Sequence, residues 1–184
     1  MPFVWKGASV TRLMPTAESV DLMALAEQVA SDELAPRASD DEAAAAFPRD
    51  AFTLLGGLGF LGLPFDEEHG GAAQPYEVTL QVLEELARAW LTVGIGVSVH
   101  YLSAFPVATF GSAEQRERWL PTMTGGDLLG GYCLSEPGSG SDAAGLTTRA
   151  ERTDSGYRVN GVKTWITHGG RADYYAAMVR TSDD

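Results

Sequence analysis

The sequence predicts an α+β protein, with an N-terminal all-α helical domain over residues 1–126 and an incomplete antiparallel β-barrel or sandwich over residues 127–184. Apolar residues recur at helical spacings through the first two thirds of the chain, whereas short alternating segments with glycine turns fill the last third. Helices followed by strands indicate segregated domains. The expected strands are fewer than a closed barrel or sandwich uses, so the β domain is predicted to be incomplete.

The first helices are predicted from their capping residues. Thr16 can cap a helix in which the apolar residues at positions 22, 25, 26 and 29 fall on one face. Ser39 and Glu42 have the spacing of a capping box before an alanine run. Pro48 can begin a further short helix, which the glycines at 56 and 57 would end.

The clearest amphipathic pattern follows Pro75, where one helix face is apolar and the opposite face is charged. We expect the apolar face to be buried and the charged face to be solvated. The apolar stripe consists of Tyr76, Leu80, Leu83, Ala87 and Trp90, and the charged residues are Glu84, Glu85 and Arg88.

Segment 90–110 carries no formal charge and is long enough to span a bilayer. Glycine, serine, histidine and proline interrupt it, and no basic flank marks an orientation. We therefore predict a buried helix of the helical domain and no membrane span. A short amphipathic helix is expected at 113–123.

Strands are predicted at 128–135, 147–152 and 174–180, and a hairpin over 157–167. The hairpin depends on Asn160-Gly161, because this dipeptide suits the two positive φ angles of a type I′ turn. Segment 162–167 would then be a strand, with Trp165 and Thr167 on one face and Ile166 on the other.

Composition restricts the function. A net charge of −12 argues against a general nucleic-acid or anionic-membrane surface. The single cysteine, Cys133, allows neither an intrachain disulfide nor a cysteine-based zinc site, and it fits a reducing compartment. The three histidines lack metal-ligand spacing, so no metal site is predicted. The first 14 residues lack the pattern of a secretory signal.

The first informative motif is GYCLSEPGSGSD at 131–142, in which a strand runs into a proline-glycine turn. Strand periodicity places Tyr132 and Leu134 on one face and Cys133 on the other, with Ser135 where the strand meets the loop. The backbone N–H groups of the loop glycines, together with its serine hydroxyls, can hold anionic or carbonyl oxygens. A tight β-turn without a ligand explains the same pattern equally well.

The second motif is NGVKTWITHGG at 160–170. An indole beside a hydroxyl suits a flat heteroaromatic ring, because the indole can stack on it or abut it while the hydroxyl bonds to its edge. Taken alone, a core tryptophan is the simpler interpretation.

Together the two motifs resemble the flavin segments of the acyl-CoA dehydrogenase family, which read much like YCLSEPGSGS and WIT. GLGFLGLPFDEEHGG at 57–71 and FGSAEQRERWLP at 110–121 also resemble that family, in the same order. The resemblance implies an FAD cofactor, with Ser141 also touching the acyl-CoA and the Thr167 hydroxyl near flavin N5. The implied cofactor-binding residues are Tyr132, Cys133, Leu134, Ser135, Gly140, Ser141, Trp165, Ile166 and Thr167.

The resemblance also implies the reaction, which introduces an α,β double bond into an acyl-CoA thioester. In the family, a glutamate from a C-terminal helical domain removes the α-proton while the β-hydride goes to flavin N5. No residue of this chain matches that glutamate, so we expect no catalytic residue here and an inactive chain on its own. Glu136 is interpreted as a turn-stabilising side chain. The helices around 75–110 are expected to line the acyl chain with apolar surface.

The same resemblance implies acyl-CoA as substrate, electron-transfer flavoprotein as electron acceptor and a tetrameric homo-oligomer. A cytoplasmic location is expected from the single cysteine and the missing secretory pattern. Two alternatives stay open. The chain could belong to an acyl-CoA oxidase or another flavin superfamily member, or it could be a non-catalytic binding module with a truncated fold.

Overall fold

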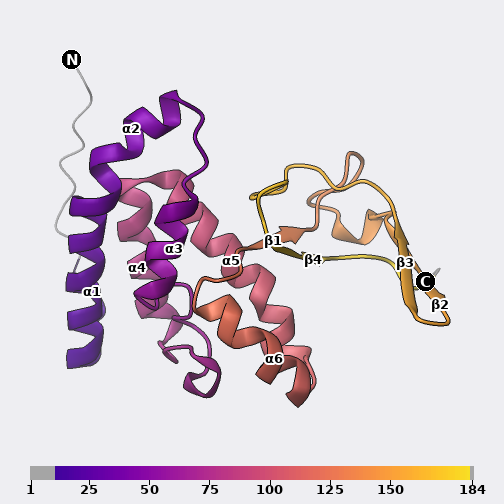
Figure 1. Ribbon diagram of the computed structural model, residues 1–184, viewed down its shortest axis with the longest axis horizontal. Helices are drawn as coiled ribbons and strands as arrows, with labels where there is room; N and C mark the ends of the chain where they lie inside the picture. Colours follow the sequence, from indigo (N-terminus) through magenta and orange to yellow (C-terminus); the bar gives the residue numbers. More distant parts are fainter. Residues whose placement is uncertain (1–10, 183–184) are drawn as a thin grey trace.

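The computed structural model describes residues 11–182 and shows a helical part followed by a β part, as Figure 1 illustrates. The predicted fold class is confirmed. The helical part contains α1 (Ala17–Val29), the π-helical turn η1 (Ala30–Leu34), α2 (Ala35–Ala43), α3 (Arg49–Gly57), the 3₁₀ turn η2 (Glu67–His69), α4 (Tyr76–Ala89), α5 (Leu91–Phe110) and α6 (Ala113–Thr124). The β part contains β1 (Gly130–Cys133), the 3₁₀ turn η3 (Ala143–Gly145), β2 (Arg149–Thr153), β3 (Gly156–Asn160) and β4 (Tyr174–Ala177).

The predicted cap of α1 is confirmed, because Thr16 Oγ1 accepts a hydrogen bond from the Ser19 N–H at 3.0 Å. The capping box expected at Ser39 and Glu42 is wrong. The chain continues helically from α1 through η1 into α2, so Ser39 lies inside a helix and has no free N-terminus to cap. The Glu42 carboxylate instead accepts a hydrogen bond from Trp90 Nε1 at 2.7 Å.

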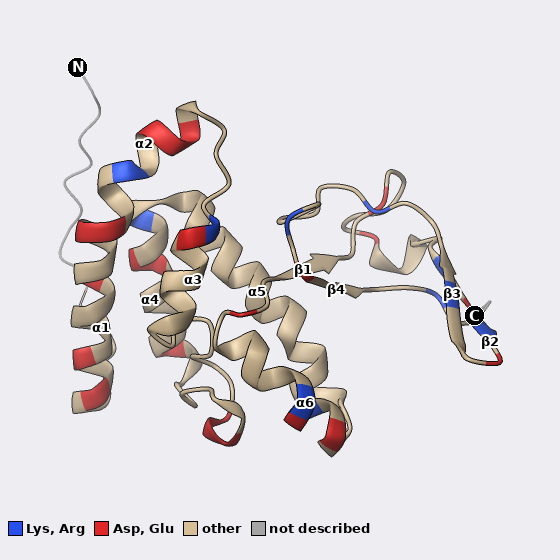
Figure 2. Ribbon diagram, in the orientation of Figure 1, with Lys and Arg blue, Asp and Glu red and all other residues tan. Residues whose placement is uncertain are grey.

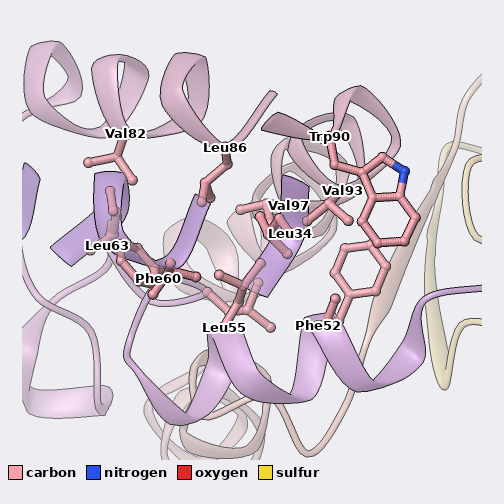
Figure 3. Close-up of a cluster of buried hydrophobic side chains, with 14 of the residues drawn as sticks. Leu34, Phe52, Leu55, Phe60, Leu63, Val82, Leu86, Trp90, Val93 and Val97 are labelled. Atoms are coloured by element: carbon pink, nitrogen blue, oxygen red, sulfur yellow. The ribbon is translucent and has the colours of Figure 1, made fainter. Parts of the chain in front are cut away.

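A large apolar cluster holds α1, α3, α4 and α5 together, and a smaller one packs α6 against α5. Figure 3 shows side chains from α3, α4 and α5 pointing into the larger cluster, with Leu86 and Val97 facing Leu55 and Phe60. These four side chains are fully buried. Burying one such leucine or phenylalanine contributes about 1.5–3 kcal/mol relative to leaving it exposed.

The buried face of α4 differs from the predicted stripe. Tyr76 and Leu80 are 63% and 60% exposed, whereas the side chains that α4 buries are Val78, Thr79, Val82, Glu85 and Leu86. The prediction of the solvated face failed because Glu85, although charged, is only 3% exposed. Its carboxylate pairs with Arg12 at 2.8 Å and with Arg88, which lets an ionised side chain lie on the packed face.

Helix α5 is the one helix in the described part of the chain with the length and apolar composition to cross a membrane. One of its faces packs against α4, α6 and β1 and buries Val93, Gly94, Gly96, Val97, His100, Ser103 and Ala104. The glycines on this face allow close approach, because a Cβ at Gly94 would lie 2.5 Å from the Ala87 Cβ.

The β part contains two strand pairs. β2 and β3 form an antiparallel hairpin in which Thr153 faces Gly156, so its two-residue turn is Asp154-Ser155. β1 and β4 pair in parallel, with Cys133 opposite Ala177, although an antiparallel arrangement was expected. Figure 1 shows β1 beside α5 and the β2–β3 hairpin far from the helices.

The predicted hairpin around Asn160-Gly161 is wrong. Asn160 ends β3, and residues 161–167 form no strand. Gly161 has φ 154°, and a Cβ there would lie 2.4 Å from Thr148 Oγ1. The glycine therefore allows the backbone to pass close to Thr148. The sequence pattern had indicated a hairpin turn at this position.

The charges are unevenly distributed. Figure 2 shows acidic residues on α1, α2, α4 and the loop beside α6, whereas the β2–β3 hairpin carries basic and acidic residues together. The negative net charge therefore resides mainly on the helical part.

Candidate functional site

The first predicted motif forms the end of β1 and an open turn. The Glu136 N–H donates to Ser139 O at 2.7 Å, and the Ser139 N–H donates back to Glu136 O at 3.2 Å. These two bonds enclose Pro137 and Gly138. Both Gly138 and Gly140 are exposed, and nothing lies within 4 Å of the position a Cβ would take at either residue. The turn therefore presents bare backbone to solvent.

Residues 161–168 of the second motif form no strand, so the expected alternation of Trp165, Ile166 and Thr167 across two strand faces is wrong. Trp165 has φ 58° and His168 has φ 65°, values that bulky residues rarely adopt. Such backbone geometry concentrates at binding and catalytic sites. The Trp165 side chain is 94% exposed, whereas Ile166 and Thr167 are half-buried.

The two motifs lie side by side. The Thr164 N–H donates to Ser135 O at 2.9 Å, and a Cβ built at Gly131 would lie 3.2 Å from Thr167 O. The second segment thus runs alongside the first without a regular ladder. The structure brings together the predicted residues from 132–135 and from 165–167, as a shared binding surface requires.

The buried carboxylate of Glu136, in the first motif, bonds to Lys163 of the second motif and to the segment before β2. It accepts hydrogen bonds from the Thr147 N–H at 2.6 Å, the Thr148 N–H at 2.9 Å and Lys163 Nζ at 2.9 Å. The bonds from Thr148, Lys163 and Thr147 outweigh burial and hold the pKa of Glu136 well below its usual range. These contacts agree with the interpretation of Glu136 as a turn-stabilising residue.

Two histidines join the helical part to the site. His100 Nδ1 accepts from the Gly130 N–H at 3.1 Å, and His100 Nε2 lies 3.0 Å from Met123 O. His168 Nδ1 lies 3.0 Å from Gly130 O. Burial lowers the pKa of His100 to about 4 and also lowers that of His168, so both rings are neutral near pH 7. His168 Nε2 has no hydrogen-bond partner within the described residues and lies beside the Phe52 ring.

An apolar groove opens between α4 and α5. The α4 side chains that the sequence had placed in the core, Tyr76 and Leu80, lie on one wall. Leu102 and Phe105 of α5 lie on the other. The complete lining is Pro64, Phe65, Tyr76, Thr79, Leu80, Leu83, Ser98, Tyr101, Leu102 and Phe105.

Within residues 11–182, no group of three or more histidine, cysteine, aspartate or glutamate side chains is placed to hold a metal ion. The surface formed by the two motifs instead offers an exposed indole, a half-buried threonine and bare backbone. Such groups can contact the face and edge of a flat heteroaromatic ring.

Comparison with known proteins places the chain in a family. The family model for the acyl-CoA dehydrogenase N-terminal domain matches residues 16–127, and the model for the acyl-CoA dehydrogenase middle domain matches residues 131–184. The chain belongs to the acyl-CoA dehydrogenase family. The two matched ranges meet where α6 gives way to β1.

Individual members of the acyl-CoA dehydrogenase family align over nearly the whole chain. An acyl-CoA dehydrogenase of Bacillus subtilis (strain 168) is 35% identical over 170 residues, which cover 92% of this chain and 45% of that protein. The short-chain specific acyl-CoA dehydrogenase of Homo sapiens mitochondria is 37% identical over 166 residues, covering 89% of this chain and 39% of that protein. The chain therefore spans less than half the length of these relatives.

A solved structure shows the same fold. The glutaryl-CoA dehydrogenase of Mycobacterium smegmatis, in complex with FADH2, superposes with a TM-score of 0.86 at 31% identity. The superposition covers 92% of this chain and 44% of that one.

Two residues at the site were missed by sequence reasoning. Lys163 was quoted within a motif but assigned no role, although a lysine between a glycine and a tryptophan in an otherwise uncharged segment is an available signal. His100 was treated as one of three scattered histidines. Its position in a long uncharged helix was the signal that it is buried and hydrogen-bonded.

Proposed function

We propose that this chain supplies the flavin-binding face of an FAD-dependent acyl-CoA dehydrogenase. The observation that supports the proposal most strongly is the convergence of 132–135 with 165–167, which the Thr164 to Ser135 hydrogen bond maintains. Two segments distant in the sequence meet where the family resemblance requires a single ring to bind.

The residues present fit the cofactor. Trp165 exposes 94% of its side chain beside a backbone held at positive φ, and an apolar indole held in this way is suited to contact a ring system. The turn around Gly138 and Gly140 leaves room for close approach of a ligand to the backbone. We propose Tyr132, Cys133, Leu134, Ser135, Gly140, Ser141, Trp165, Ile166 and Thr167 as cofactor-binding residues, with Ser141 also contacting the substrate.

In this proposal FAD supplies the redox chemistry, since when bound it accepts the hydride that leaves the β-carbon of the acyl-CoA. The chain's own residues bind and orient. Trp165 and Thr167 would flank the ring, and backbone groups at 134–135 would meet its polar edge. The apolar groove between α4 and α5, lined by Leu80 and Leu102 among others, offers apolar surface near the helices that we expect to line the acyl chain.

Removal of the α-proton requires a base. The family resemblance assigns it to a glutamate of a C-terminal helical domain, and we assign it to no residue of this chain. We therefore expect the 184-residue chain alone to bind FAD without dehydrogenating a thioester. Electron-transfer flavoprotein as acceptor, a tetrameric assembly and a cytoplasmic location are parts of the same proposal.

Fluorescence can test cofactor binding directly. FAD titrated into the purified chain should quench tryptophan emission, and the flavin absorbance bands should co-elute with the protein. The matched control is Trp165→Phe, which should fold normally because the indole is 94% exposed but should lose most of the quenching. A chain that retains no flavin after reconstitution, and whose emission does not change, contradicts the proposal.

A further inference from the structure

A little-exposed ion pair joins the two proposed ring-binding motifs. Lys163 Nζ lies 2.9 Å from Glu136 Oε1, and the two side chains are only 12% and 4% exposed. Hydrophobic residues of similar size often stabilise a protein as well as a buried ion pair does, because desolvation offsets the attraction. Stability alone is therefore a weak explanation for placing two charges here.

Lys163 links the two ring-binding segments, because it precedes Trp165 by two residues in the chain and bonds to the backbone of the first segment. Its chain neighbours lead directly to Trp165, and its ammonium group also donates to Leu134 O at 2.9 Å. The next residue, Thr164, donates its N–H to Ser135 O at 2.9 Å. These contacts fix the separation between the 134–135 backbone and the 165–167 segment.

The bond to Leu134 O also sets a direction. A trans peptide is planar, so its C=O and the following N–H point to opposite sides. No peptide bond among the described residues is cis. When Lys163 draws the Leu134 carbonyl toward itself, the Ser135 N–H is turned away from Lys163. No acceptor within residues 11–182 bonds to that N–H, which leaves it available for a ligand.

Glu136 connects the pair to a third segment. Its carboxylate accepts the Thr147 N–H at 2.6 Å and the Thr148 N–H at 2.9 Å, just before β2 begins. The Glu136 carboxylate is therefore held from one side by the backbone, and it in turn holds the Lys163 ammonium group. Side chains fixed in this way can keep a binding surface in one geometry.

We propose that Lys163 and Glu136 are positioning residues for the flavin ring, acting through the Leu134–Ser135 peptide and the Trp165–Thr167 segment. This inference rests on the proposed function. Neither side chain is required to touch the cofactor. The pair sets the spacing and orientation of the groups that do.

The experiment compares FAD binding by the chain and by Lys163→Met, which keeps the length of the side chain and removes its charge. Binding is measured by flavin absorbance and by tryptophan quenching. We expect about tenfold or more weaker binding, because one partner of a buried, hydrogen-bonded charge pair is lost. We also expect a shifted visible flavin spectrum, which a purely structural role would not produce. Lys163→Arg should recover part of the affinity.

Glu136→Gln provides the second variant, and Arg37→Met is the matched control, since it removes the two surface ion pairs of Arg37 with Asp41 and Asp50 in the helical part. Glu136→Gln should weaken binding in the same direction. The double variant Lys163→Met/Glu136→Gln should lose less affinity than the two single losses combined, as expected for coupled residues. Arg37→Met should bind FAD as the unmodified chain does.

The outcomes separate this inference from the proposed function. If the unmodified chain fails to bind FAD, both are wrong. If it binds FAD and Lys163→Met binds equally well with an unchanged spectrum, only the positioning role is wrong. If both pair variants lose binding only in proportion to a loss of unfolding free energy without ligand, the pair stabilises the fold, and the positioning role is again wrong.

Discussion

His100 makes the stability of this chain depend on pH. Both ring nitrogens are engaged: Nδ1 accepts the Gly130 N–H at 3.1 Å, and Nε2 faces Met123 O at 3.0 Å. The proton of the neutral ring is therefore on Nε2. Protonating Nδ1 would place an N–H against the Gly130 N–H and a charge in a fully buried position. Burial accordingly lowers the pKa of His100 to about 4.

The direction and magnitude follow from linkage. The folded-state pKa lies below the unfolded value of 6.5, so this contribution is fully present above pH 6.5 and is lost as the pH falls toward 4. Each pKa unit corresponds to about 1.36 kcal/mol. Between pH 7.5 and 4.5 the unfolding free energy should therefore fall by about 2.5 kcal/mol through His100 alone. The pKa of His168 is also lowered by burial, and this group changes stability in the same direction.

Urea unfolding at pH 7.5, 6.5, 5.5 and 4.5 measures the effect. The matched variant is His100→Gln, whose amide can still donate toward Met123 O but does not titrate. The difference in unfolding free energy between the two proteins isolates His100 from every carboxylate that titrates in the same range. The unfolding free energy of the unmodified chain should fall by about 2.5 kcal/mol relative to that of His100→Gln between pH 7.5 and 4.5. A difference that stays constant with pH would refute the reasoning, because His100 would then not be held neutral by its surroundings.

Two further predictions test the packing. Gly130→Ala should destabilise the chain by about 1–3 kcal/mol in urea unfolding, because a Cβ there would lie 1.9 Å from Ser103 Oγ; a change under 0.5 kcal/mol would mean that α5 and β1 separate easily. Leu86→Ala should cost about 2–5 kcal/mol, whereas Leu80→Ala, at a residue 60% exposed, should cost about 0.5 kcal/mol or less. A larger loss of stability for Leu80→Ala than for Leu86→Ala would mean that α4 buries the apolar stripe predicted from the sequence.

Helix starts were predictable wherever a local signal decides them. Thr16 caps α1 because a hydroxyl three residues before a free N–H is sufficient. The buried face of α4 was not predictable in the same way. Whether Tyr76 or Val78 faces the core depends on α1 and α5, and on Arg12 lying close enough to neutralise Glu85. No local pattern carries that information.

The site shows the same division. That the segments around Tyr132 and Trp165 belong together was predictable from the family resemblance, and in the structure the Thr164 N–H donates to Ser135 O. Their role in binding a ring stays a prediction. The local conformation was not. The turn formed at Asp154-Ser155, and Gly161 was used for packing against Thr148. Trp165 has a positive φ, and strand periodicity contains no signal for such a backbone conformation.

The parallel pairing of β1 with β4 has a consequence for how the chain folds. Residues 134–173 lie in the connection between these two strands, and they include the Leu134–Ser135 peptide and the 165–167 segment. Closing so long a loop costs entropy before any strand contact is gained, and such distant pairings form slowly. The helices can assemble through contacts nearer in sequence. We expect the amides of β1 and β4 to gain protection from hydrogen exchange during refolding only after those of α4 and α5, so that the binding surface forms last.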